Sequence, residues 1–270
     1  MKTLRESFDK SKYMSYKQDS YFPAYDKILR QFVGRPITIV EVGVLYGGSL
    51  FMWRDYFGES ATIIGVDFNP EAKKWEAEGF KIYIGDQSSE KFWDGLFKEI
   101  GSVDILIDDG GHTNRQQIVT LRKAVHHIRD GGLLIVEDTH ASYMSEFGNP
   151  SRYSFISFAK RIIDHLHGRY GGDLVAAKPP ARQIFSVEFF ESMTVFTIDR
   201  RLTKMSEFVT NGGISSVTED YRYKNSVLEK LRNRTWKGHR FIRSFYKRLI
   251  WLELRRQNFL TKSLFNKIDV

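Results

Sequence analysis

The stretch from residue 103 to residue 140 limits the possible folds more than any other part of the chain. Its sequence, VDILIDDGGHTNRQQIVTLRKAVHHIRDGGLLIVEDTH, contains two apolar runs with a helical pattern between them. Two strands joined by one helix form a βαβ unit, in which the strands are parallel. Their carboxyl ends then lie at the same edge of one sheet, and open α/β sheets bind ligands at that edge.

Acidic side chains follow both of these predicted strands. Asp108 and Asp109 end the first strand, Glu137 and Asp138 end the second, and His112 lies in the turn after the first. Like charges at close range cannot all stay ionised without a counter-cation. A divalent metal ion is the simplest such cation. Oxygen ligands suit Mg²⁺, although the sequence does not distinguish it from Mn²⁺ or Ca²⁺.

Two features of this region admit more than one interpretation. Consecutive strand residues point to opposite faces of a sheet, so Glu137 and Asp138 reach one metal ion only if the strand ends there. His112 is either a general base or a residue at a helix N-terminus with a structural hydrogen bond. Its position in the same turn as the acids favours the base, because a free histidine titrates near pH 6.5.

Residues 37–44 (ITIVEVGV) predict a central parallel strand. Gly43, Gly47, Gly48 and Ser49 then precede a helix predicted over residues 50–57. A glycine-rich turn between strand and helix lets a ligand approach the backbone closely. The spacing is not GxGxxG, which argues against an NAD-linked oxidoreductase.

The next two predicted strands also end in polar side chains. Residues 61–68 end at Asp67, which is placed to accept the ribose hydroxyls of a nucleoside or, alternatively, to cap a helix near Pro70. Residues 80–84 precede Asp86 and Gln87, which either bind an adenine edge or form the turn before a helix over residues 90–100. The glycine turn and Asp67 together favour a nucleoside.

Seven strands complete the predicted fold. A helix over residues 114–129 packs on the sheet, with His126 and His127 at its surface or boundary, and another helix covers residues 153–170. Residues 184–191 and 193–200 alternate in polarity and predict an antiparallel hairpin. The fold class is therefore α/β: a Rossmann-like, mostly parallel seven-stranded sheet with an antiparallel terminal hairpin, helices on both faces and a helical basic C-terminal extension.

Three regions are expected: an N-terminal helical cap (1–36), a central domain (37–205) and the C-terminal extension (206–270). A helix over residues 22–33 covers a sheet edge or, alternatively, closes as a lid over a cofactor with Lys17 and neighbouring tyrosines facing inward. Residues 222–270 hold 14 Lys+Arg and three Asp+Glu, a net charge of +11. The whole chain carries +8, so residues 1–221 carry −3. The basicity belongs to the tail.

The chain lacks cysteine, an apolar leader at residues 1–18 and an apolar run of membrane-spanning length. We therefore expect a cytoplasmic protein. Residues 238–260 combine an apolar stripe with basic and aromatic side chains. Docking on the domain or formation of a homo-oligomer is the first interpretation of this stretch. Peripheral contact with the inner membrane face is the second, and nucleic-acid binding the third.

Residues 37–148 resemble the class I S-adenosylmethionine-dependent methyltransferases. They are most similar to the metal-dependent sugar O-methyltransferases of the macrocin and mycinamicin type. The general resemblance rests on VEVGVLYGGSLFMWRDYF, IIGVDFNP and GDQSS. The more specific motifs are IDDGGH and GGLLIVEDTHASYMSEFG, although His140 and Met144 stand where the family has aromatic residues.

The resemblance implies a role for each motif residue. The methionine moiety of S-adenosylmethionine would be held by Glu41, Gly43, Gly47, Gly48 and Ser49, the ribose by Asp67, and the adenine side by Asp86 and Gln87. The magnesium ligands would be Asp109, Glu137 and Asp138, with Asp109 also beside the cofactor. His112 would be the general base, and Asp108 would support the site or cap a helix.

The expected reaction is magnesium-dependent methyl transfer to a sugar hydroxyl of a glycan, a nucleotide sugar or a glycosylated natural product. A bound metal ion lowers the pKa of such a hydroxyl and orients it. One alternative is an RNA methyltransferase that uses the basic tail, which the acidic site argues against. Another is a non-enzymatic membrane or assembly module on a methyltransferase fold, which the intact glycine turn argues against.

Overall fold

A computed structural model describes residues 2–170, 182–204, 207 and 209–214. It also describes nine helical residues near the C-terminus, namely Arg248, Leu249, Trp251, Leu252, Arg255, Arg256, Phe259, Thr261 and Lys262. The chain divides into two compact units, Met1–Glu207 and Phe208–Val270. The sequence also allows a short helix over residues 227–234. This segment and most of the stretch 238–260 lie outside the described residues. None of the described helices is long and apolar enough to cross a membrane.

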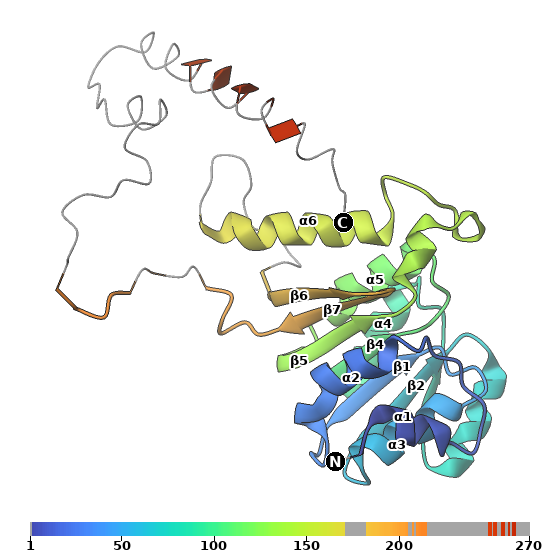
Figure 1. The fold of residues 1–270 in the computed structure, drawn as a ribbon. Coiled ribbons are helices and arrows are strands. Elements are labelled where there is room, and N and C mark those ends of the chain that lie inside the picture. Colours follow the sequence, from blue (N-terminus) through green and yellow to red (C-terminus); the bar gives the residue numbers. More distant parts are fainter. Residues whose placement is uncertain are drawn as a thin grey trace. The chain divides into compact units, whose positions relative to one another are not determined.

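A seven-stranded sheet forms the centre of the first unit (Figure 1). In sequence order the strands are β1 (Thr38–Val42), β2 (Thr62–Asp67), β3 (Lys81–Ile84), β4 (Val103–Asp108), β5 (Ile128–Val136), β6 (Ile184–Phe190) and β7 (Met193–Ile198). Their order in the sheet is β3-β2-β1-β4-β5-β7-β6. The strands β1 to β5 are parallel, and β7 runs antiparallel to β5 and β6. The predicted fold class is confirmed.

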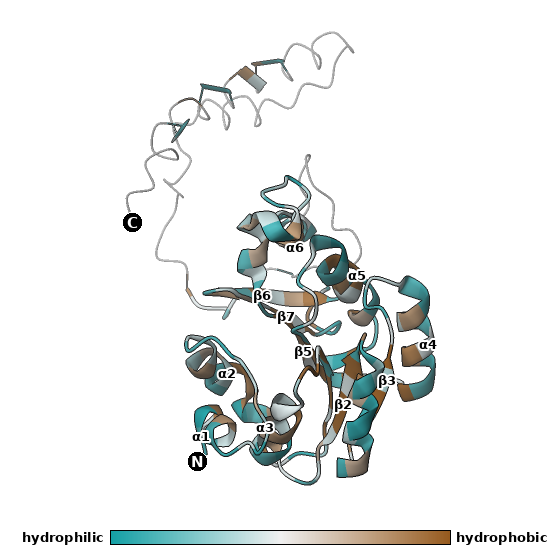
Figure 2. Ribbon diagram, turned by 90° about the vertical axis from the view of Figure 1, so that its right-hand side faces the viewer, coloured by the Kyte–Doolittle hydropathy of each residue, from teal (hydrophilic) through white to brown (hydrophobic). Residues whose placement is uncertain are grey.

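Helices cover both faces of this sheet (Figures 1 and 2). The α-helices are α1 (Leu4–Asp9), α2 (Tyr21–Leu29), α3 (Gly48–Phe57), α4 (Glu90–Ile100), α5 (Asn114–Ala124) and α6 (Phe155–His167). The 3₁₀ helices are η1 (Arg30–Phe32), η2 (Pro70–Glu78), η3 (Thr139–Tyr143), η4 (Ser145–Phe147) and η5 (Gly168–Tyr170). Buried residues of α1, α2 and α3 belong to one hydrophobic cluster, and those of α4, α5 and α6 belong to the other.

Both hydrophobic clusters draw on the same central strands. In β5, Leu133 and Ile135 belong to the first cluster, whereas Leu134 and Val136 belong to the second. Successive side chains of a strand point to opposite faces, so a strand covered on both faces needs an unbroken apolar run. Each such side chain contributes roughly 1.5–3 kcal/mol when fully buried. The sheet edge carrying the carboxyl ends of β1, β2 and β4 is therefore held rigidly.

The prediction of a helix over residues 114–129 was wrong at its C-terminal end. The helix α5 ends at Ala124, so His126 and His127 follow it, and β5 begins at Ile128, inside the range predicted as helix. Ile128 pairs with Val103 before an irregularity in the ladder, and Gly131 has a φ of +86°. Pairing with β4 thus extends this segment, although its own sequence is compatible with a helix.

Candidate active site

A cavity of about 410 Å³ opens at the carboxyl ends of β1 to β4, the edge at which the sequence predicts a ligand. Its walls come from the turns after these strands and from residues 11–20, which we call the N-terminal segment. The lining residues are Met14, Ser15, Tyr16, 42–46, Ser49, 66–68, 85–87, 109–112, Gln116 and Asp138. This volume lies within the range of roughly 300–1,000 Å³ that small-molecule pockets occupy.

The turn after β1 lies directly against the turn after β4. Gly43 has a φ of +90°, and a Cβ on it would lie 2.0 Å from the carbonyl oxygen of Asp109. Gly47 precedes α3 with a φ of +82°. Both conformations favour glycine, because other residues rarely adopt a positive φ. The two turns therefore form adjoining walls of the cavity.

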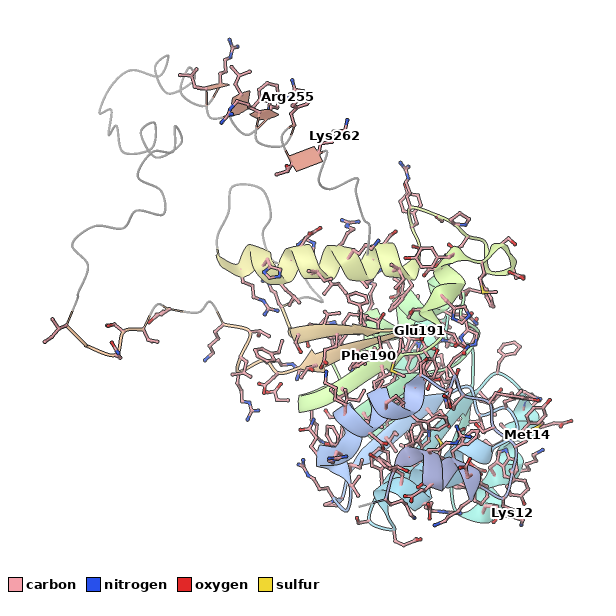
Figure 3. The ribbon with its side chains drawn as sticks, viewed as in Figure 1. Lys12, Met14, Phe190, Glu191, Arg255 and Lys262 are labelled. Carbon is pink, nitrogen blue, oxygen red and sulfur yellow. The ribbon has the colours of Figure 1, made fainter. Side chains whose placement is uncertain are left out.

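Gly48 lets the N-terminal segment cross the start of α3. A Cβ on Gly48 would lie 2.2 Å from the carbonyl oxygen of Tyr13. The Gly48 amide donates a hydrogen bond to the carbonyl of Met14 at 3.2 Å, and the Ser11 hydroxyl donates to the carbonyl of Gly48 at 2.7 Å. Figure 3 labels Met14 on this segment. The segment is thus bonded to the glycine turn on both sides of the Gly48 peptide.

Glu41 lies beneath the glycine turn and does not line the cavity. Its carboxylate accepts hydrogen bonds from the Ser49 hydroxyl at 2.7 Å and from Nε1 of Trp53 at 2.9 Å. Burial raises the pKa of Glu41 to about 7, against the opposing effect of the Lys17 ammonium. A direct contact of Glu41 with the methionine moiety stays a prediction, while its support of Ser49, a lining residue, is visible.

Asp67 lines the cavity and fixes the turn after β1. Its Oδ2 accepts hydrogen bonds from the amides of Val44 at 2.8 Å and Leu45 at 3.0 Å. The side chain of Asn69, and not that of Asp67, caps the helix η2. The alternative interpretation of Asp67 as that helix cap is therefore wrong, and binding of the ribose stays a prediction.

Asp86 and Gln87 both line the cavity, but their side chains already have partners. Asp86 accepts hydrogen bonds from the amide and hydroxyl of Ser88. The Gln87 amide group donates to Oδ1 of Asp108 at 2.9 Å and accepts from the Gly111 amide at 2.9 Å. Gln87 therefore connects the turn after β3 to the turn after β4. Its predicted contact with adenine is not tested.

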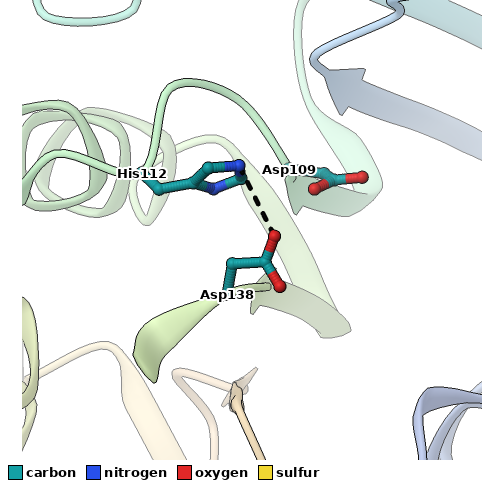
Figure 4. Close-up of side chains that lie close together, drawn as sticks. All are labelled: Asp109, His112 and Asp138. Atoms are coloured by element: carbon teal, nitrogen blue, oxygen red, sulfur yellow. Dashed lines mark ion pairs between the residues drawn. The ribbon is translucent and has the colours of Figure 1, made fainter. Parts of the chain in front are cut away.

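Asp109, His112 and Asp138 come together at one end of the cavity (Figure 4). One potential ligand atom from each side chain lies within 4.8 Å of the others, and Nε2 of His112 is 3.5 Å from Oδ2 of Asp138. His112 and Asp138 have φ angles of +56° and +51°. The left-handed conformation of Asp138 ends the strand geometry there. Glu137 is buried, whereas Asp138 reaches the cavity.

The N-terminal segment and α2 supply polar partners to these acids. Nζ of Lys17 lies 2.7 Å from both Oδ2 of Asp109 and Oε1 of Glu137, and its side chain is only 1% exposed. The Tyr25 hydroxyl donates a short hydrogen bond to the same Oε1 of Glu137. The Tyr21 hydroxyl donates to Oδ1 of Asp138 at 2.7 Å. Lys17 and these tyrosines face inward, as the lid alternative expects, while closure of this segment over a cofactor stays a prediction.

Four acids form what we call the acid cluster: Glu41, Asp109, Glu137 and Asp138. Burial is the main cause of the pKa shifts of Glu41 and Glu137. Burial, reinforced by the Asp109 carboxylate, raises the pKa of Glu137. Burial opposes the charge on Lys17, but Asp109, Glu137 and Glu41 outweigh it and raise the pKa of the ammonium group. Lys17 therefore stays protonated and neutralises part of the cluster.

The remaining atoms of the acid cluster fit a divalent cation. Among the described residues, no hydrogen bond engages Oδ1 of Asp109 or Oε2 of Glu137. Within the part of the chain that the structure describes, the buried atoms Nδ1 of His112 and Oδ2 of Asp108 also have no hydrogen-bond partner. Carboxylate oxygens are the ligands that suit Mg²⁺ or Mn²⁺. The predicted assignment of Asp109, Glu137 and Asp138 as metal ligands is compatible with this arrangement and stays a prediction.

Ser192 is a further polar residue beside Asp138 that the sequence pattern does not indicate. Ser192, in the turn after Phe190 and Glu191 (Figure 3), accepts a hydrogen bond from the Tyr21 hydroxyl at its carbonyl and contacts Nδ1 of His140 through its hydroxyl. The alternating pattern of the two strands predicts the turn at Ser192, but it does not predict that Tyr21 and His140 contact this residue. Only the positive φ of Ser192, +59°, marks its unusual position, and that is a structural observation.

Comparison with known proteins finds relatives that are methyltransferases. Residues 40–139 match a family model described as a methyltransferase domain. The 8-demethyl-8-alpha-L-rhamnosyl tetracenomycin-C 2'-O-methyltransferase of Streptomyces olivaceus is 30% identical over 74% of this chain and 54% of its own length. The demethylmacrocin O-methyltransferase of Streptomyces fradiae is 30% identical over 58% and 43%, respectively. The chain thus spans about half the length of these relatives.

A solved structure agrees with the fold. The MycE methyltransferase from the mycinamycin biosynthetic pathway, in complex with Mg, SAH and mycinamycin VI, superposes with a TM-score of 0.64. It is 24% identical and covers 81% of this chain and 56% of its own. Together with the strand order and the glycine turn, these matches make the chain similar to the class I S-adenosylmethionine-dependent methyltransferases. Within that class it resembles the sugar O-methyltransferases of the macrocin and mycinamicin type.

Proposed function

We propose that this protein is a magnesium-dependent O-methyltransferase that transfers a methyl group from S-adenosylmethionine to a sugar hydroxyl. The observation that carries the proposal is the convergence of Asp109, His112 and Asp138 at one end of a nucleoside-sized cavity. The relatives, which include methyltransferases of a rhamnosyl tetracenomycin and of mycinamicin VI, support a sugar acceptor.

A second cavity, of about 270 Å³, supports an acceptor site next to the cofactor site. It is lined by Tyr16, Lys17, Gln18, Tyr21, Asp109, Glu137 and Asp138. Tyr16, Asp109 and Asp138 line both cavities. A hydroxyl bound in the second cavity would therefore meet the acids at the boundary with the first. The volume suits one sugar ring better than a larger group, because drug-sized ligands occupy roughly 300–1,000 Å³.

The residues of the site would have separate roles in binding and proton transfer. When bound, Mg²⁺ would lower the pKa of the acceptor hydroxyl and S-adenosylmethionine would supply an electrophilic methyl group. Asp109, Glu137 and Asp138 would hold the metal ion, and Asp67 the ribose. His112 would accept the hydroxyl proton at Nε2, and Asp138, 3.5 Å away, would stabilise the resulting imidazolium.

Calorimetric titration of S-adenosylhomocysteine, first in EDTA and then with Mg²⁺, tests the proposal. Wild-type protein should bind the nucleoside and give a separate magnesium heat, which Asp109→Asn should abolish because it removes a carboxylate charge. Methyl transfer to simple glycosides follows as the activity test. Nucleoside binding without a magnesium heat would contradict the metal mechanism. No nucleoside binding under either condition would favour the non-enzymatic alternative.

A further inference from the structure

Lys17 belongs to the N-terminal segment, 92 residues from Asp109 along the sequence, yet its ammonium group lies inside the acid cluster. It contacts two carboxylates at 2.7 Å and approaches a third, that of Glu41, at 4.0 Å. An ammonium group with a 1% exposed side chain is expensive to desolvate, and only close opposite charges compensate that cost. The chain thus holds a permanent cation beside the place where a divalent cation is proposed.

The contacts of Lys17 fall on one oxygen of each carboxylate. Oδ2 of Asp109 and Oε1 of Glu137 accept from Nζ, and the Tyr25 hydroxyl donates to the same Oε1. Oδ1 of Asp109 and Oε2 of Glu137 take no hydrogen bond from the described residues. Asp109 and Glu137 both line the second cavity. Each carboxylate is therefore fixed through one oxygen, which leaves the other oxygen for a ligand.

We propose that Lys17 is a positioning residue that orients Asp109 and Glu137 for the divalent metal ion. This inference rests on the proposed function. Partners that hold metal-binding carboxylates in place commonly change metal affinity by about 10–100-fold when they are removed. Lys17 does so from the N-terminal segment, so this segment is part of the metal site as well as a wall of the cofactor cavity.

Contacts elsewhere on the N-terminal segment separate these two roles. Ser11 and Met14 bond to Gly48 independently of Lys17. Loss of the Lys17 ammonium should therefore weaken binding of Mg²⁺ while leaving the cofactor cavity covered. A merely structural lysine would change thermal stability without this selectivity between metal and nucleoside.

The experiment compares Mg²⁺ and S-adenosylhomocysteine affinities of Lys17→Met and Lys17→Arg with wild type by calorimetry. Lys17→Met should bind Mg²⁺ about 10–100-fold more weakly and bind the nucleoside in EDTA within threefold of wild type. Lys17→Arg should recover part of the magnesium affinity, because it restores a cation. The matched control is Lys27→Met, since Lys27 is 63% exposed and its contacts are with Glu188 and Phe190 and not with the acids. It should behave as wild type.

Equal or tighter Mg²⁺ binding by Lys17→Met would overturn the inference, since Lys17 would then be irrelevant to the metal ion or compete with it. If Lys17→Met does not fold, Lys17→Arg decides. Its planar guanidinium keeps the charge but cannot reproduce the single Nζ that lies 2.7 Å from both carboxylates. It should bind Mg²⁺ several-fold more weakly than wild type, so an unchanged affinity would overturn the inference. Wild-type protein that binds the nucleoside but no Mg²⁺ would overturn the proposed metal mechanism itself, and the role of Lys17 with it.

Discussion

Asp138 has a left-handed backbone conformation that most residues avoid but that Asp and Asn tolerate. Asp138→Asn is therefore the informative substitution, because it removes the charge while keeping shape and backbone preference. We expect the affinity for Mg²⁺ to fall at least tenfold, or about 1.4 kcal/mol, as measured by calorimetry. Asp94→Asn is the control, since Asp94 is 62% exposed and pairs with Lys123. Unchanged magnesium affinity in Asp138→Asn would remove Asp138 from the metal site.

Glu41 predicts a dependence of stability on pH. Burial raises its pKa from 4.5 to about 7, so the folded state binds the proton more tightly than the unfolded state. This contribution is fully present below pH 4.5 and is lost as pH rises through 7. Glu41→Gln lacks the titration. The free energy of unfolding of wild type relative to this variant should therefore fall between pH 5 and pH 8 by up to about 3 kcal/mol. Urea titrations in EDTA measure this difference, and a constant difference would contradict the pKa shift.

The sequence predicts the grouping of the acids, but it places Lys17 and the tyrosines facing inward only as one of two alternatives, and the reason lies in the fold. A βαβ unit necessarily brings the ends of its two strands to one edge, so Asp109, His112 and Asp138 were predictable as neighbours. Lys17 reaches them across 92 residues, through a segment without regular structure, and no periodicity encodes that contact. A lone lysine among spaced tyrosines was the only available signal, and it fits a surface segment equally well.

At the scale of elements, the crossing of the N-terminal segment over α3 depends on the absence of a side chain at Gly48. In Gly48→Ala, the added Cβ would lie within 2.4 Å of the Tyr13 and Met14 carbonyl oxygens, so the segment must shift. We expect a loss of roughly 1–3 kcal/mol in the free energy of unfolding, typical of overpacking. Affinity for S-adenosylhomocysteine should fall about tenfold, because Met14 and Tyr16 line the cofactor cavity.

Gly95→Ala is the matched control for Gly48→Ala. Gly95 lies inside α4, and a Cβ on it would meet no atom within 4 Å. Alanine favours a helix interior over glycine by about 1 kcal/mol, so this variant should be as stable as wild type or more stable. Thermal unfolding and nucleoside titration of both variants check the pair. Equal nucleoside affinity in the two variants would show that the segment does not cover the cavity.

The boundary between α5 and β5 is a feature that the sequence pattern does not predict. The apolar run of β5 is unambiguous, but residues 128–132 (IRDGG) carry no period of their own, and pairing with β4 draws them into the strand. Strand pairing is set by neighbours distant in sequence, and the start of β5 depends on such pairing. The apolar strands themselves were therefore more predictable than the boundary between α5 and β5.

At the scale of the whole molecule, the two compact units differ in charge. Residues 208–270 contain 14 Lys+Arg and five Asp+Glu, a net charge of +9, which leaves −1 for residues 1–207. Every residue that lines the two cavities at the acid cluster lies between positions 14 and 138. Cofactor and metal binding should therefore reside in the first unit alone.

Two truncated chains test this division. One ends at residue 207, and the other ends at residue 199, just before Arg200. Its guanidinium donates hydrogen bonds to the carbonyls of Val125 and Ile128 and to the carboxylate of Asp130, so it satisfies backbone groups at the start of β5. Residues 1–207 should unfold near the temperature of the full chain and bind S-adenosylhomocysteine within threefold of its affinity. Residues 1–199 should be less stable by roughly 1–3 kcal/mol, because buried carbonyls lose charged donors.

Thermal unfolding and calorimetry on the two truncated chains separate a stability boundary from a functional one. Intact binding by residues 1–207 would leave the basic unit free for acceptor docking, self-association or surface attachment, none of which requires it to touch the cofactor. Loss of nucleoside binding in residues 1–207, with stability retained, would instead mean that the basic unit completes the cavity. A stable protein of residues 1–199 would show that packing of β7 against β5, and not the Arg200 hydrogen bonds, determines the C-terminal boundary of the fold.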